Sequence, residues 1–133
     1  MTVVAAAAGG DFAVALTAAG AVYACGSYEA GQLGNGVTGE RIVTAGKTAF
    51  DTQCSWGQVT EGGLATETIT SVAAGAAHTL ALTSSGAVYS WGSGAYGRLG
   101  HNGAKDELKP RRIAAFDPPR WVVAAAGSGG LVL

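Results

Sequence analysis

One stretch of the sequence occurs twice. Segment 20–27 reads GAVYACGS and segment 86–93 reads GAVYSWGS, so the residue numbers of the two copies differ by 66. With this offset the match extends over 9–34 and 75–100, and half of the paired residues are identical. Self-similarity at a period of tens of residues is the signature of a repeat architecture, in which each unit packs against its neighbours.

Within each copy, the apolar pattern predicts two β-strands joined by a turn. Apolar side chains alternate over 12–17 with a period of two, which is typical of a strand. Gly20 suits the turn because glycine adopts positive φ without steric cost, and 21–25 supplies the returning strand. The second copy repeats this pattern around Gly86, so we expect two antiparallel hairpins.

The remaining segments are organised around these hairpins. A glycine-spaced segment follows each one, over 26–36 and 92–103, and then a variable connection leads to the next unit. The first connection, about 37–65, is long, and we expect a surface loop there. The residues 121–127 resemble 69–75, with a spacing of 52 between Gly75 and Gly127. The predicted division is a first repeat over 3–68, a second over 69–118 and the start of a third over 119–133.

The composition is that of an ordered chain with little net charge. Of the 133 residues, 48% are hydrophobic and 13% are charged, and the net charge is −1. This balance gives no general attraction to nucleic acid or to an anionic membrane. The longest apolar run, 3–8, is too short to span a bilayer and has no basic leader. We therefore expect no membrane insertion and an intracellular location, cytoplasmic or nuclear, with an organelle also open.

The two cysteines form no recognisable metal or disulfide motif. Cys25 and Cys54 have no CxxC spacing, so neither a zinc site nor a disulfide framework is predicted. Cys25 stands where the second copy has Trp91, and we expect it to be a small buried apolar residue. Cys54 is expected to be an ordinary thiol.

The second copy resembles a known repeat family. Segment 72–83 (VAAGAAHTLALT) leads into 86–92 (GAVYSWG) and then into 94–101 (GAYGRLGH). This order is similar to that of the regulator-of-chromosome-condensation repeat. The first copy departs from the pattern, since Phe12 replaces the histidine and Cys25 replaces the tryptophan.

The resemblance implies an all-β fold, a seven-bladed β-propeller with four antiparallel strands per blade, of which this chain supplies about two blades. A propeller needs about four or more blades to close its ring and protect its sheet edges. We therefore expect a piece of a longer propeller or a subunit of a larger assembly. The residues that carry the structural motif are Gly9, Gly20, Tyr23, Gly26, Gly31, Leu33, Gly34, Gly75, His78, Gly86, Tyr89, Trp91, Gly92, Gly97, Leu99 and Gly100.

Segment 92–97 (GSGAYG) fits the GxGxxG pattern of dinucleotide-binding loops. In such a site the loop opens a helix, but 98–103 (RLGHNG) is rich in helix breakers. The first copy has Tyr28 at the middle glycine position. A repeated structural turn explains both copies, and no cofactor is predicted.

The titratable residues form no recognisable catalytic constellation. His78 and His101 are the only histidines, and neither has a serine, cysteine or carboxylate at a suggestive spacing. We expect His78 to be a buried imidazole that is hydrogen-bonded to backbone in the inner strand of its blade. The acids of the long connection are expected to be solvated surface residues, namely Asp51, Glu61 and Glu67.

A short basic stretch surrounds Pro110 and consists of Lys109, Arg111, Arg112 and Arg120. A patch that binds phosphate or acidic groups is conceivable, but a solvated edge is favoured because Asp106 and Glu107 lie beside it. The candidate residues for partner contact are Tyr28, Tyr96, Arg98, Arg111 and Arg112.

The sequence favours a non-catalytic module for protein–protein interaction, or scaffold, whose partners are other protein chains. The first alternative is guanine-nucleotide exchange on a small GTPase, the activity of the family's namesake, carried out by a full-length parent. A further alternative is a parent with an appended catalytic module, such as a ubiquitin ligase or kinase domain, whose substrates the repeats select. Fold alone does not decide between them.

Overall fold

The computed structural model describes residues 2–27, 31–36, 40–42, 48–50, 52–94, 99, 105–113, 125–127 and 130–132. Strands dominate this part of the chain, with one 3₁₀ segment, η2, between the sixth and seventh strands. The elements are β1 (Val3–Ala8), β2 (Phe12–Thr17), β3 (Val22–Ser27), β4 (Glu40–Ile42), β5 (Thr48–Phe50), β6 (Thr52–Gln58), η2 (Glu61–Thr66), β7 (Ile69–Ala74), β8 (His78–Thr83), β9 (Val88–Gly92), β10 (Glu107–Arg112), β11 (Ala125–Gly127) and β12 (Gly130–Val132). No helix in these residues is long and apolar enough to cross a bilayer.

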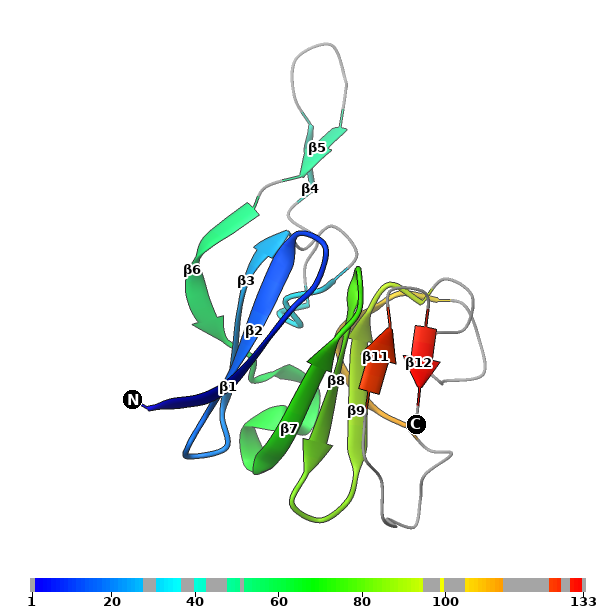
Figure 1. Cartoon of the computed structure of the whole chain (residues 1–133). Coiled ribbons are helices and arrows are strands. Elements are labelled where there is room, and N and C mark those ends of the chain that lie inside the picture. The colour runs from blue at the N-terminus through cyan, green and yellow to red at the C-terminus, as the bar shows by residue number, and fades with distance from the viewer. Residues whose placement is uncertain are drawn as a thin grey trace.

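Two four-stranded antiparallel sheets stand side by side (Figure 1). Blade 1 has the strand order β1-β2-β3-β6, and blade 2 has the order β7-β8-β9-β10. The two predicted hairpins are β2–β3 and β8–β9, and their registers agree, since Leu16 pairs with Val22 and Leu82 pairs with Val88. The prediction of an all-β fold built from four-stranded antiparallel blades is confirmed.

The prediction of a surface loop over 37–65 is wrong for much of that segment. Strand β6 lies within it and completes blade 1 by pairing with β3. Strands β4 and β5 form a separate hairpin, which projects beyond the end of the blade 1 sheet in Figure 1. Strand β6 reads TQCSWGQ, a mostly polar sequence at a sheet edge, so the apolar alternation that reveals a central strand is missing.

The hairpin turns use a threonine in addition to the glycine. Gly20 and Gly86 have φ of 85° and 90°, as the turn positions require. The Oγ1 of Thr17 accepts a hydrogen bond from the backbone N–H of Ala21 at 3.1 Å. The Oγ1 of Thr83 accepts the corresponding bond from Ala87 at 3.0 Å. The turn geometry that the two hairpins share thus depends on a side-chain acceptor, which the apolar pattern alone does not reveal.

Replacing Thr83 by valine should lower the free energy of unfolding by about 1–3 kcal/mol, because the buried N–H of Ala87 loses its acceptor while the side-chain volume is kept. Urea denaturation followed by circular dichroism would measure the change. Thr70→Val is the matched control, since the Thr70 hydroxyl donates to Leu82 O at an exposed position. Its effect should stay below about 0.5 kcal/mol, and equal losses in both variants would contradict the role of Thr83.

The core lies between the two blades. Alternate side chains of β2, including Val14 and Leu16, pack against Ala81 and Trp91 on the facing side of blade 2. Strand β7 contacts both β1 and β2, so the first strand of blade 2 lies against the first two strands of blade 1. On the other side of blade 2, β11 contacts β7 and β8 and pairs with β12. The beginning of a third unit therefore stands against blade 2, while blade 1 carries a sheet face that blade 2 does not cover.

Candidate interaction surface

Trp91 of blade 2 is a central contact between the two blades. Its side chain is fully buried, and its indole Nε1–H donates to the backbone carbonyl of Gln32 in blade 1 at 3.0 Å. Gly34 lies against the ring, since a Cβ at this position would stand 3.1 Å from the indole nitrogen. The Gly36 N–H donates to Leu108 O at 2.9 Å. Segment 31–36 of blade 1 therefore contacts both Trp91 and β10, the outer strand of blade 2.

A second contact at this interface involves Tyr89. The Tyr89 residue is only 7% exposed, and its hydroxyl donates to Glu67 Oε1 at 3.5 Å. Burial and the negative charge of Glu67 raise the pKa of the phenol, while the positive charge of Arg112 opposes part of this effect. The folded protein therefore favours the neutral phenol.

The pH dependence of stability follows from this raised pKa. The stabilisation from Tyr89 is fully present below the ordinary tyrosine pKa of 10.0 and is lost as the pH rises through the higher pKa of the folded state. Above that ordinary value, the free energy of unfolding should fall more steeply for the wild type than for Tyr89→Phe. Urea titrations at increasing alkaline pH would measure both slopes. Glu67→Gln should give an intermediate slope, and identical slopes in all three proteins would contradict the assignment.

Blade 1 presents an apolar face on the side away from blade 2, which we call the outer face. A hollow of about 230 Å³ lies on it, lined by Val3, Ala6, Ala15, Tyr23 and Trp56. Val3 is 53% exposed and Trp56 is 50% exposed. Apolar side chains gathered around one hollow on a sheet face mark a candidate contact surface.

The equivalent face of blade 2 is covered within this same chain. The residues 66 positions after Val3, Ala15 and Tyr23 are Ile69, Ala81 and Tyr89, which are buried against blade 1. In the interface between blade 1 and blade 2, the face of blade 2 that is equivalent to the outer face is therefore the one covered by the neighbouring blade.

Cys25 also belongs to the outer face, because it follows Tyr23 at a spacing of two along β3. The repeat pattern predicts a buried residue at this position, but Cys25 is partly exposed. The physical reason is that its counterpart Trp91 is buried by the neighbouring blade, whereas nothing in the described part of the chain covers the outer face.

Trp56 was not predicted as a functional residue, because it lies outside the repeat pattern. Strand pairing explains its position. Tyr23 pairs with Gln58 in blade 1 as Tyr89 pairs with Arg112 in blade 2, so Trp56 on β6 corresponds to Pro110 on β10. The available signal was a tryptophan within an otherwise polar connection.

The predicted motif residues frame the hairpins and the interface between the blades. In blade 1, Gly9 precedes β2, Gly20 lies in the turn between β2 and β3, and Gly26 lies within β3. Leu33 is buried in segment 31–36. His78 is fully buried at the start of β8, the second strand along the chain in its blade. The predicted residues that lie outside the described residues are Tyr28, Asp51, Tyr96, Gly97, Arg98, Gly100, His101 and Arg120.

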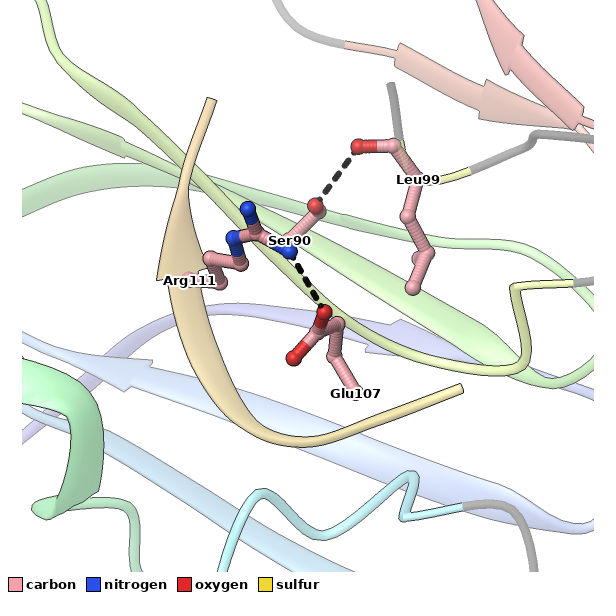
Figure 2. A network of polar contacts seen from close by, with 4 residues as sticks. All are labelled: Ser90, Leu99, Glu107 and Arg111. Atoms are coloured by element: carbon pink, nitrogen blue, oxygen red, sulfur yellow. Dashed lines mark hydrogen bonds and ion pairs between the residues drawn. The ribbon is translucent and has the colours of Figure 1, made fainter. Parts of the chain in front are cut away.

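Two polar contacts lie at β9 and β10 of blade 2 (Figure 2). Ser90 Oγ donates to Leu99 O at 2.8 Å, which anchors the segment after β9. Arg111 forms an ion pair with Glu107 at 2.9 Å, and its side chain is 56% exposed. An exposed pair of this kind contributes little stability. Arg112 is also exposed, so these two candidate contact residues lie at the solvated edge of blade 2.

The part of the chain that the structure describes holds no group of three or more His, Cys, Asp or Glu side chains that could bind a metal ion. Gly92 of the GxGxxG segment ends β9 with φ of 106°, and residues 95–98 lie outside the described ranges.

Comparison with known proteins places these blades in a family. The pattern described as the Regulator of chromosome condensation (RCC1) repeat matches residues 3–32 and 69–98, and a second form of it matches 85–133. The human E3 ubiquitin-protein ligase HERC2 is 38% identical over 121 residues, which cover 91% of this chain and 2% of HERC2. Mouse Protein RCC2 is 37% identical over 121 residues, which cover 84% of this chain and 23% of RCC2. The chain thus spans a small part of these relatives.

Solved structures give the same fold. Human WBSCR16 matches with a TM-score of 0.77 and 27% identity, over 95% of this chain and 29% of that one. Prp20p from Saccharomyces cerevisiae matches with a TM-score of 0.72 and 24% identity, over 98% of this chain and 30% of that one. With both the repeat pattern and the blade architecture in agreement, the chain belongs to the family of RCC1-repeat proteins, and its two sheets are blades of a partial β-propeller of that family.

Proposed function

We propose that this chain is a non-catalytic module for protein–protein interaction, whose outer face packs against a further β-propeller blade in a larger body. The observation that carries the proposal is the apolar hollow around Tyr23 and Trp56 on the outer face of blade 1. In blade 2, the equivalent face is covered by blade 1. The occupant that fits best is therefore a blade with an apolar face like that of Val14 and Leu16.

The magnitude of the exposed surface supports a contact there. A tryptophan side chain buries about 150–250 Å² when it is covered, and apolar burial contributes about 25 cal/mol per Å². Covering the exposed half of Trp56 would therefore contribute about 2–3 kcal/mol. Val3 adds to this on the same face, so an uncovered outer face carries a sizeable cost.

The relatives are consistent with protein binding in general terms. The structures of Prp20p are described together with its binding to Gsp1p and histones and in a complex with Kap60. At 24% identity these comparisons carry the fold alone, so no partner is transferred from them. HERC2 is named a ubiquitin ligase, and an appended ligase in the parent of this chain stays a prediction.

Site-specific photocrosslinking tests the proposal. A photoreactive amino acid would replace Trp56 on the outer face or, as a matched control, the exposed Thr70 on β7. Native complexes would be irradiated, sized by sedimentation and sequenced by mass spectrometry. We expect crosslinks from position 56 to reach an RCC1-type blade, in this protein's own longer chain or in a partner, and the control to lack them. Crosslinks that reach no such blade would overturn the proposal.

Guanine-nucleotide exchange by a full-length parent is the alternative and calls for a different readout. Faster release of labelled GDP from a small GTPase in the presence of the native complex would favour exchange. An unchanged rate of release, together with blade crosslinks from position 56, would favour the non-catalytic module.

A further inference from the structure

The fold brings the two cysteines of the sequence to neighbouring strands. Cys25 lies on β3, and the backbone of Cys54 lies on β6. These strands are antiparallel neighbours, and Gly26 pairs with Gln53. Because opposing residues in an antiparallel ladder change by one in opposite directions, extending the register of this pair by one residue leads from Gly26 and Gln53 to Cys25 and Cys54.

The register shifts at this point. The following pair in the ladder is Ala24 with Gly57, so the three residues 54–56 of β6 span the interval opposite Cys25. A bulge leaves its extra residues outside the regular ladder, and the strand bends there. Cys54 continues the register of the Gly26–Gln53 pair, and Trp56 continues that of the Ala24–Gly57 pair, so both residues lie beside Cys25 along β6.

The hydrogen-bond alternation fixes the kind of pairing at Cys25. Val22 O accepts from Val59 N on the β6 side of β3, whereas Ser27 N donates to Asp11 O on the opposite, β2 side. Even-numbered residues of β3 therefore bond toward β6, and Cys25 occupies a non-hydrogen-bonded position toward it. In a regular antiparallel ladder, opposing Cα atoms at such positions approach to about 4.5 Å, which lies within the range of about 4.4–6.8 Å found for disulfides, and the bend of β6 at the bulge sets the distance here.

We propose that Cys25 and Cys54 form a reversible intrachain disulfide, which makes this strand pair a site of redox modification. Cys25 is partly exposed on the outer face, so a soluble oxidant reaches it. In the reaction with oxidised glutathione, the Cys25 thiolate attacks one sulfur, forms a mixed disulfide and releases one glutathione. The Cys54 thiolate then displaces the second glutathione, so two protein thiols are oxidised and one glutathione disulfide is reduced to two thiols.

The disulfide would join the outer strand of blade 1 to the body of the sheet. The crosslink would close a loop that contains the β4–β5 hairpin and segment 31–36, which contacts Trp91. Oxidation should therefore protect β6 from proteolysis and raise the unfolding temperature, because a crosslink constrains the unfolded chain. Blade 2 has no equivalent pair, since Trp91 and Leu108 stand at the positions that correspond to Cys25 and Cys54.

Incubation of the full chain with oxidised glutathione tests the proposal, followed by non-reducing mass spectrometry and peptide mapping. We expect the mass to fall by two hydrogen atoms, both free thiols to disappear, and one crosslinked peptide to contain Cys25 and Cys54. Dithiothreitol should restore both thiols. Cys25→Ser and Cys54→Ser should each gain one glutathione instead, because the second thiol is missing.

A variant with Thr70→Cys and Cys54→Ser keeps two cysteines but places them on different blades. It should gain glutathione on both thiols and form no intrachain crosslink. Two glutathione adducts on the wild type, covalent dimers through either cysteine, or two unreacted thiols would each overturn the proposal. These outcomes do not depend on which body covers the outer face.

Discussion

Replacing Trp91 by alanine should lower the free energy of unfolding by about 3–5 kcal/mol, the usual cost of removing a fully buried large aromatic ring. The substitution leaves a cavity between the two blades and removes the indole hydrogen bond to Gln32 O. Domains are stable by only about 5–15 kcal/mol, so much of the total would be lost. Urea denaturation monitored by far-ultraviolet circular dichroism would give the value.

Two further variants separate the contributions at this position. Trp91→Phe keeps an aromatic ring without the N–H donor and should cost about 1–3 kcal/mol. Trp56→Ala is the matched control, because that tryptophan is half-exposed on the outer face and should cost less than about 1 kcal/mol. If Trp91→Ala were no more harmful than Trp56→Ala, the assignment of Trp91 as the central contact between the blades would be wrong.

Replacing Gly92 by valine should prevent stable folding of blade 2 or cost more than about 4 kcal/mol. Gly92 has φ of 106°, which a β-branched residue strongly disfavours. A Cβ there would also stand 2.8 Å from His78 Cα and would clash with the carbonyl oxygen of Ala77. Both are backbone atoms of the paired strand, so the clash cannot be relieved by turning a side chain. Soluble yield and the unfolding temperature would measure the loss.

Gly63→Ala separates backbone strain from steric clash. Gly63 also has positive φ, at 88°, but no heavy atom lies within 4 Å of a Cβ built there. Its cost should be about 1–2 kcal/mol from the backbone conformation alone. Gly92→Ala should cost clearly more than Gly63→Ala because it adds the clash. If the two alanine variants lost similar amounts of free energy of unfolding, the close approach of Gly92 to the backbone of His78 would be contradicted.

Local signals made much of the fold predictable. The turns at Gly20 and Gly86 need positive φ, and the flanking strands alternate with a period of two, so both hairpins could be placed from neighbouring residues. The doubled sequence then indicated that two similar sheets stand together. Trp91 could be expected in the core because a large aromatic residue recurs at that position in the family pattern.

Features that depend on pairing between distant strands were not predictable. Strand β6 is mostly polar and gains its identity only from hydrogen bonds to β3. The candidate surface was missed for the same reason, since Trp56 joins Tyr23 and Val3 only after β6 has paired. Cys25 is a second example. It occupies the repeat position of Trp91, but its burial depends on a neighbouring blade that the local sequence does not encode.

The β4–β5 hairpin has a consequence for how proteins of this kind can change in length. It lies between β3 and β6, and the pairing of those two strands is complete without it. Extra residues can enter here without altering the pairing between the two blades. The connection between β3 and β6 is thus a suitable insertion site. A new binding loop or a reporter domain could be inserted there while the register of every blade strand is preserved.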